Sequence, residues 1–307
     1  MPASSFCVKV RISFPLVISS HPSHSRLAAM KIKKAVITAA GPNQKHLPLQ
    51  TLVNPTGETK TVAGFLLDEI FSSGIESAAI IIAPGTQSDF SSAVASHLEK
   101  VTLIEQSEPQ GYGHAVLQAR EFVDSDPFLL MMSDHLYLSF AETSCLQQLL
   151  TIASQSTGPV SAVQPTYESK LSYYGTVAGT PVPGLQGVYD VSRIMEKPTP
   201  TVAEQELIVP GLRSGNYLCF FGMHVLTPSV MTHLADRFQK GESLALTPSL
   251  DALAAGEKYL ACEISGLRFN IEEPYGLLRA QLGMALSGEA RDEVMATMIE
   301  LIAATRR

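Results

Sequence analysis

The chain has 307 residues, which is enough for one large α/β domain with an additional lobe. Apolar residues make up 45% of it and charged residues 17%, a balance that excludes extended disorder. The net charge is -7 and the one basic run consists of Lys31, Lys33 and Lys34, so we expect no nucleic-acid partner. A small anionic ligand held by a local group of lysines is compatible with this composition.

The cysteines and the apolar runs indicate the compartment. Four scattered cysteines form no CxxC pair, which argues against a zinc site and against a disulfide framework: Cys7, Cys145, Cys219 and Cys262. A reducing compartment is the default for such cysteine usage. No apolar run approaches the ~20 residues that cross a bilayer. We therefore expect a soluble cytoplasmic protein with no membrane partner.

Residues 1–29 differ in composition from the rest of the chain. They contain no acid and combine Lys9, Arg11 and Arg26 with many serines, a composition typical of a transit segment. The interpretation that we favour is a poorly structured extension ahead of a true start at Met30.

Beyond residue 33, short apolar runs alternate with amphipathic segments of helical length. This alternation predicts an α/β fold with a mainly parallel central sheet flanked by helices. The expected strands are 35–38, 78–83, 101–105, 128–132 and 160–163. The expected helices between them are 61–73, 88–100 and one that begins near Gly113.

After residue 165 the chain becomes rich in Tyr, Gly, Thr and Pro, which predicts a smaller mixed-sheet lobe that lengthens the sheet. Helices are expected at 228–238, 248–255, 274–286 and 291–304. The last of these carries an apolar stripe, for which we favour core packing. A contact in a homo-oligomer is the minority interpretation.

A glycine-bearing loop follows the first expected strand. It opens with Ala39, Ala40 and Gly41, and backbone N–H groups at such a position can face phosphates. Lys45 can add a positive charge. The loop lacks both GK[ST] and GxGxxG, so it is neither a P-loop nor a dinucleotide fingerprint. Taken alone, an ordinary turn is the better interpretation.

A second loop follows the third expected strand, and an acid follows the fourth. The loop carries Gln106 and, five residues later, Gly111, ahead of a helix with His114 in its first turn. Asp134 stands at the carboxyl end of its strand, where ligands of open parallel sheets bind. A lone acid at this position is as often a helix cap as a metal ligand.

Several motifs occur in an order that resembles one known family. Residues 111–115 read GYGHA, close to GLGHA, and residues 41–48 are similar to GxGTRxxP. Tyr174-Gly175 and the EKP of 196–198 come later. On these motifs the chain resembles the sugar-phosphate nucleotidyltransferases over about residues 31–287, particularly the bacterial enzymes that act on UTP and glucose 1-phosphate. The resemblance implies a Rossmann-like fold and the formation of UDP-glucose, or a related nucleotide sugar, with release of pyrophosphate.

The resemblance also implies how the chain is divided. A nucleotidyltransferase domain would span 30–287, with a nucleotide-binding part at 30–165 and a sugar-binding lobe at 166–272. A C-terminal helix would occupy 288–307.

Roles for individual residues follow from the same resemblance. The residues expected at the nucleotide are Ala39, Ala40, Gly41, Gln106 and Gly111. The residues expected at the sugar 1-phosphate are Tyr174, Gly175, Glu196, Lys197 and Asn216. A side-chain amide such as that of Gln106 offers a donor and an acceptor together, which suits the imide edge of uracil or thymine. His114 is expected to be a structural residue.

The resemblance assigns catalysis to three residues and a cofactor. Lys45 would contact the triphosphate, Lys197 would lie beside the sugar phosphate, and Asp134 would hold Mg²⁺. Asn270 occupies the position of the family's second metal aspartate, and Glu272 is the alternative ligand.

Departures from the family pattern leave other functions open. Lys45 lacks the planar fork of the family's arginine, residues 50–59 contain no lysine, and Asn270 is neutral. One alternative is therefore a catalytically weak nucleotide-sugar-binding or regulatory homologue. A thymidylyltransferase that uses dTTP is another, because Gln106 and Gly111 would accept thymine as well. A nicotinamide dehydrogenase fits the alternation of elements but not the phosphate loop.

Overall fold

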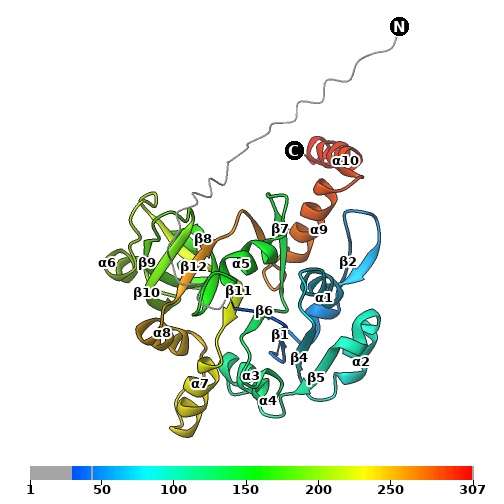
Figure 1. The fold of residues 1–307 in the computed structure, drawn as a ribbon. Coiled ribbons are helices and arrows are strands. Elements are labelled where there is room, and N and C mark those ends of the chain that lie inside the picture. The colour runs from blue at the N-terminus through cyan, green and yellow to red at the C-terminus, as the bar shows by residue number, and fades with distance from the viewer. Residues whose placement is uncertain (1–29, 43, 306–307) are drawn as a thin grey trace.

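The computed structural model describes residues 30–42 and 44–305, so the extension expected over residues 1–29 lies outside the described residues. The described chain forms a nine-stranded sheet with helices on both faces (Figure 1). The strand order is β5-β4-β1-β6-β11-β8-β12-β10-β9. The expected α/β class is confirmed.

One half of the sheet is parallel. It consists of β1 (Lys34–Ala39), β4 (Ser77–Ile82), β5 (Val101–Glu105) and β6 (Phe128–Met132). The two inner strands, β1 and β4, are almost wholly buried and read KAVITA and SAAIII. Helices cover both faces there, so neither face requires polar residues. This is why the sequence predicted these four strands closely.

The other half of the sheet is mixed. Strand β11 (Asn216–Leu226) is antiparallel to both β6 and β8 (Val160–Tyr167). Beyond β8 lie β12 (Leu260–Glu263), β10 (Val188–Glu196) and β9 (Gly175–Pro181), of which β12 alone is parallel to its neighbour β8. The strands after residue 165 thus continue the central sheet, as expected, and the parallel character is concentrated in the half around β1.

Two hydrophobic cores lie against the sheet, one on each face. Helices α1 (Val62–Ser72) and α5 (Cys145–Ala153) contribute to the first. Helices α3 (Tyr112–Gln118), α7 (Ser229–Gln239) and α8 (Thr247–Gly256) contribute to the second. Each core removes the apolar stripe of its helices from water, which is the main stabilising term for such layers.

Polar caps set where two of these helices begin. The Thr61 side chain accepts a hydrogen bond from the Gly64 N–H at the start of α1. At the start of α5, Ser144 and Gln147 form a reciprocal capping box. Each cap satisfies N–H groups that have no partner within the helix and contributes about 1 kcal/mol.

Two expected helices are interrupted. The helix expected over 88–100 forms as α2 (Gln87–Ala93) and then a 3-10 segment, Ala95–Lys100, because the buried Val94 leaves helical geometry. The helix that begins near Gly113 ends as α3 and resumes as α4 (Arg120–Val123). The remaining helix of the lobe is α6 (Pro200–Glu206).

Short antiparallel pairs were not expected from the sequence. Strand β7 (His135–Ser139) pairs with β13 (Gly266–Asn270), which sets His135 opposite Asn270. Strands β2 (Thr51–Val53) and β3 (Thr59–Thr61) form a second small pair. The β7–β13 pair matters for function because it brings a segment near the end of the chain beside the end of β6.

The chain ends in two helices, α9 (Gly276–Ser287) and α10 (Arg291–Ala304). The predicted apolar stripe of α10 consists of Val294, Met298, Leu301 and Ile302, and no residue of this helix is buried. The first two of these side chains are half-buried and the last two are exposed. The core packing predicted for this stripe is therefore wrong for the single chain, and the homo-oligomer contact stays a prediction. Within the described ranges no helix is long and apolar enough to cross a membrane.

A buried hydrogen-bond cluster joins β8, β11 and Tyr259, the residue directly before β12. The Ser161 hydroxyl lies 2.6 Å from Nδ1 of His224 and 2.7 Å from the Tyr259 hydroxyl, and all three residues are buried. We expect Ser161→Ala to lower the free energy of unfolding by about 2–4 kcal/mol, because two buried polar groups lose their partner at once. Urea unfolding measures this. Ser92→Ala, at an exposed position in α2, should change it by less than about 0.5 kcal/mol, and a Ser161 variant equal to this control would contradict the expectation.

Candidate active site

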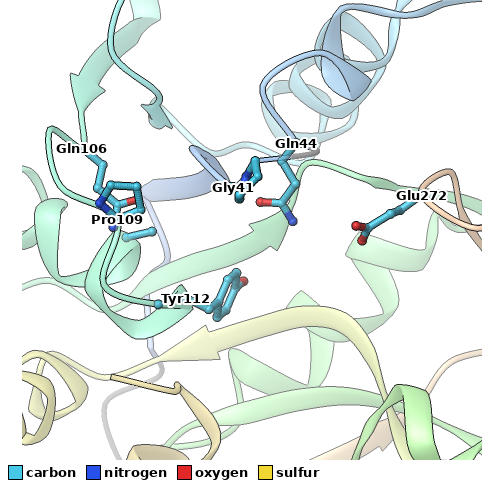
Figure 2. A pocket seen from close by; sticks show the side chains of 9 residues that line it. Gly41, Gln44, Gln106, Pro109, Tyr112 and Glu272 are labelled. Atoms are coloured by element: carbon cyan, nitrogen blue, oxygen red, sulfur yellow. The ribbon is translucent and has the colours of Figure 1, made fainter. Parts of the chain in front are cut away.

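A cavity of about 290 Å³ lies beyond the carboxyl ends of β1 and β5 (Figure 2). Its lining comes from two loops, the start of α3 and the segment after β13: Gly41, Pro42, Gln44, Gln106, Pro109, Gly111, Tyr112, Ala115 and Glu272. Open α/β sheets bind their ligands in this location. Three of the residues expected at the nucleotide, Gly41, Gln106 and Gly111, line this one cavity.

The loop after β1 folds back on itself. The N–H groups of Gln44 and Lys45 both donate to the Gly41 carbonyl, at 3.0 and 3.2 Å. Ala39 and Ala40 are buried behind this turn. Lys45 is exposed and does not line the cavity, whereas Gln44 does and donates to Oδ2 of Asp134 at 3.4 Å. The side chain that reaches inward is therefore the amide and not the expected lysine.

The loop that carries Gln106 and Gly111 is held close to the segment before α8. Gly111 has a φ of 104°, and a Cβ there would lie 3.0 Å from the Leu244 carbonyl oxygen. Glycine is therefore required both by the backbone conformation and by the space. Gln106 is 2% exposed, and its amide nitrogen lies 2.8 Å from Nδ1 of His114. The loop thus presents a side chain whose orientation is constrained.

Asp134 is a buried carboxylate at the end of β6. It is 1% exposed, and its Oδ1 has no hydrogen-bond partner among the described residues. Burial above all, with a smaller contribution from Glu272, raises the pKa of Asp134 to about 6, although the Gln44 amide acts in the opposite direction. Burial also lowers the pKa of the adjacent His135 well below its usual range, so this ring supplies no positive charge. The carboxylate is therefore poised to accept an external cation or donor.

The segment after β13 delivers a second carboxylate. The Asn270 amide oxygen accepts from the Glu272 N–H at 2.9 Å, and the Ile271 N–H donates to the Asp134 carbonyl at 2.9 Å. These bonds set the turn from which the Glu272 side chain points into the cavity (Figure 2). Asn270 itself is not among the lining residues.

The carboxylate oxygens of Asp134 and Glu272 are suitable ligands for a divalent cation. Mg²⁺ takes oxygen ligands and is usually bound by one or two carboxylates together with substrate phosphates and water. Asp134 has a buried oxygen without a hydrogen-bond partner among the described residues and adjoins the cavity through Gln44, and Glu272 lines the cavity. Among the residues that the structure describes there is no group of three or more His, Cys, Asp or Glu side chains that could hold a metal alone. The site therefore suits a metal that arrives with a phosphorylated ligand.

Four of the residues expected at the sugar phosphate gather at one end of β9 and β10. Gly175 and Glu196 are opposite each other in the β9–β10 register, and the Lys197 N–H donates to the Tyr174 carbonyl at 3.1 Å. Lys197 has a φ of 46°, and its Nζ lies 3.9 Å from Glu196 Oε1. Asn216 is not part of this group, because its amide donates to the Ser214 carbonyl within its own loop.

Two packing contacts hold this group in place. A Cβ on Gly175 would lie 2.6 Å from the Phe220 ring, so only glycine fits there. The Tyr174 ring lies 4.0 Å from the Arg268 guanidinium, and its hydroxyl donates to Glu273 at 3.3 Å. Tyr174 is thereby linked to the segment that carries Glu272.

Tyr112 is a lining residue that the sequence did not single out. Its hydroxyl is buried and has no hydrogen-bond partner among the described residues. Burial raises the pKa of Tyr112 well above its usual range, the neighbouring Thr38 hydroxyl opposes this, and the charges of Asp134 and Glu196 add to it. The hydroxyl is therefore neutral and lies near both of these carboxylates. The sequence did offer one sign of this residue, because Tyr112 stands where the family motif GLGHA has leucine.

Comparisons with known proteins identify the family of this chain. A family model described as nucleotidyl transferase matches residues 34–263. The chain belongs to this nucleotidyl transferase family. The UTP–glucose-1-phosphate uridylyltransferase of Streptococcus pneumoniae is 26% identical over 301 residues, which cover 88% of this chain and 96% of that protein.

Solved structures share the nucleotidyl transferase fold. A UTP-bound UDP-glucose pyrophosphorylase from Acinetobacter baumannii matches with a TM-score of 0.69 and 21% identity, over 88% of this chain and 100% of that one. A UDP-glucose pyrophosphorylase complexed with UDP-glucose matches with a TM-score of 0.67 and 22% identity, over 82% and 97%. These likenesses confirm the Rossmann-like class.

The charge of Asp134 makes the stability of this nucleotidyl transferase depend on pH. Its pKa in the folded protein, about 6, lies above the 3.8 of an ordinary aspartate. Protonation therefore favours the folded state, and this stabilisation is complete below pH 3.8 and lost as the pH rises through 6. We expect Asp134→Asn to raise the free energy of unfolding at pH 8, in a metal chelator, by about 3 kcal/mol.

The experiment is urea unfolding of both proteins from pH 8 downward. The difference between them should shrink as the pH falls below 6, and a difference that is constant with pH would contradict the assignment. Asp190→Asn, at an exposed position in β10, should change the unfolding free energy by less than about 0.5 kcal/mol throughout.

The unpartnered hydroxyl of Tyr112 gives a second expectation. Tyr112→Phe removes a buried polar group that has no partner in the ligand-free protein. We expect this variant to be more stable than the wild type by about 1 kcal/mol, measured by thermal unfolding without ligand. A loss of stability would mean that the hydroxyl already has a partner within the protein.

Proposed function

We propose that this protein transfers UMP from UTP to a hexose 1-phosphate, with glucose 1-phosphate as the first candidate, and releases pyrophosphate. The observation that carries the proposal is one cavity with a buried amide, Gln106, in one wall and the carboxylate of Glu272 in another. The buried carboxylate of Asp134 adjoins that second wall, where it contacts the lining residue Gln44 and interacts with Glu272. A pyrimidine at the first and phosphates at the second match a nucleoside triphosphate. The names of the similar proteins support the same substrates.

At the base, Gln106 and the backbone around Gly111 would contact uracil. Gln106 is fixed by burial, and Gly111 allows the backbone to approach the ring closely. Ala39, Ala40 and Gly41 would contribute backbone groups to the nucleotide at the end of β1. Thymine and uracil have the same imide edge and differ only in the 5-methyl group of thymine. The test below therefore includes dTTP.

At the phosphates, Asp134 would hold Mg²⁺ with Glu272 as its second carboxylate. Asn270, the ligand expected from the motif position, would act instead by holding the Glu272 backbone. When bound, the metal would neutralise charge on the phosphate oxygens. Gln44 keeps the Asp134 carboxylate oriented, and the Tyr112 hydroxyl is available to donate to a phosphate oxygen. Lys45, exposed on its loop, would reach the triphosphate from outside the cavity.

At the sugar phosphate, Lys197 would supply positive charge between two anionic reactants. Glu196 and the Tyr174-Gly175 backbone would meet the sugar hydroxyls. Asn216 stays a weaker candidate for this region, because its side chain bonds within its own loop.

The chemistry is a single displacement. A phosphate oxygen of the sugar 1-phosphate attacks the α-phosphorus of UTP, the bond to the bridging oxygen breaks, and pyrophosphate leaves with that electron pair. The nucleophile is already an anion, so no covalent enzyme intermediate and no general base are needed. The residues above contribute alignment and charge neutralisation, which account for most of phosphoryl-transfer catalysis.

Pyrophosphate release with glucose 1-phosphate and Mg²⁺ tests the proposal. We expect turnover with UTP, less with dTTP and little with ATP or GTP. Binding of UTP without turnover would support the binding or regulatory alternative instead, and turnover highest with dTTP would make the protein a thymidylyltransferase.

The metal assignment has its own variants. Glu272→Gln should reduce turnover and raise the Mg²⁺ concentration required, by at least about tenfold. Asn270→Ser keeps an oxygen that can accept the Glu272 N–H, so it should have the smaller effect. The reverse order would assign the metal to Asn270.

A further inference from the structure

We propose that His114 determines which pyrimidine this protein accepts, by fixing the orientation of the Gln106 amide. This role rests on the proposed contact between Gln106 and the base. His114 touches neither substrate in this arrangement, so it is a positioning residue. It was expected from the sequence to be structural only.

The geometry is a chain of three side chains in and beside α3. The amide nitrogen of Gln106 lies 2.8 Å from Nδ1 of His114. Nε2 of the same ring lies 3.0 Å from the side-chain amide of Gln118. The His114 ring is 8% exposed and stacks on Phe238 of α7, with ring centroids 5.5 Å apart and 21° between planes. The ring therefore cannot turn freely to suit either amide.

The number of hydrogen-bond donors and acceptors on the His114 ring selects one arrangement of these three side chains. A neutral imidazole has one donor and one acceptor nitrogen, so it cannot accept from both amides. Gln106 is buried, whereas Gln118 is half-buried and can exchange its amide oxygen and nitrogen by a half-turn. Gln106 therefore donates to Nδ1, and Nε2 carries the hydrogen and donates to the Gln118 oxygen.

This arrangement decides what the cavity presents to a base. One hydrogen of the Gln106 nitrogen is engaged by His114 and the second stays available, so this bond fixes which way round the amide presents its donor and its acceptor to the ligand. The acceptor that it presents is the carbonyl oxygen. Uracil and thymine carry a hydrogen on N3 and can donate to it, whereas N3 of cytosine is an acceptor and would meet another acceptor. The chain of side chains thus favours UTP and dTTP over CTP.

A hydrogen-bond donor in place of Gln118 would reverse the direction of the hydrogen bonds that run from Gln106 through His114. If a cation donates to Nε2, the hydrogen of the ring moves to Nδ1, which then donates to the Gln106 oxygen. The amide nitrogen would turn toward the cavity and suit cytosine. Gln118→Lys makes this change from outside the cavity. Glu121→Gln is the matched control, because it raises the net charge by the same one unit at an exposed position in the neighbouring helix α4.

The experiment compares kcat/KM for UTP and for CTP, with glucose 1-phosphate and Mg²⁺. Wild type should favour UTP, and the ratio should fall by about tenfold or more in His114→Phe, which keeps an aromatic ring on Phe238 but offers no acceptor. It should fall as well in Gln118→Lys and be unchanged in Glu121→Gln. A general loss of stability would lower both rates and leave the ratio where it was.

The outcomes separate the two proposals. Wild type that turns over UTP, with a ratio equal in all variants, overturns the role of His114 and leaves the proposed function standing. Wild type that turns over both triphosphates equally also overturns it. Wild type with no activity on either overturns the proposed function and the inference with it. If His114→Phe does not fold, Gln118→Lys decides alone, since its side chain lies at the helix surface.

Discussion

The buried carboxylate of Asp134 is the constraint on which the site depends. A charge removed from water destabilises the folded state unless it is paired, and the neighbours of Asp134 supply little pairing. His135 is kept neutral by burial, Gln44 offers one amide bond, and Glu272 carries the same sign of charge. The ligand-free protein is therefore strained electrostatically at the point where we propose that a cation binds. Under that proposal stability is given up there for function, as is common at active sites.

The β7–β13 pair is what makes this arrangement possible. It continues directly from Asp134 along β7, and its partner strand ends at Asn270, so the turn that carries Glu272 is set against the end of β6. The same segment holds Tyr174 through Arg268 and Glu273. This short pair of strands thereby connects the two carboxylates and the cavity with the cluster of Tyr174, Gly175, Glu196 and Lys197. A shift of its register by one residue would turn the Glu272 side chain away from the cavity.

The sequence predicted the strands that are buried on both faces of the sheet. It did not predict the strands that form by pairing with a segment far away in the chain. Strands β1 and β6 were found because covered strands read as continuous apolar runs. Strand β13 was missed, because its residues are only partly buried and its partner lies far away in the chain. Motif spacing placed Gln106 and Asp134 correctly near the ends of their strands.

The orientations and hydrogen bonds of the side chains in the site could not be predicted from the spacing of the motifs. Nothing in the spacing of Lys45 shows that it stays outside while Gln44 turns inward. The partnerless hydroxyl of Tyr112 and the bond from Gln106 to His114 depend on contacts with other elements, including α7. Asn270 was read from its motif position as a ligand, whereas its amide is already engaged with the Glu272 backbone.

The order of the chain gives the β7–β13 pair a consequence for folding. The cavity is lined by residues 41–115 and by Glu272, which follows β13 much later in the chain. Contacts between such distant segments form slowly, because a long loop must close first. The approach of Glu272 to Asp134 and the packing of Gly111 against Leu244 both wait for such closure, so the complete cavity, with its two like charges, forms late in folding.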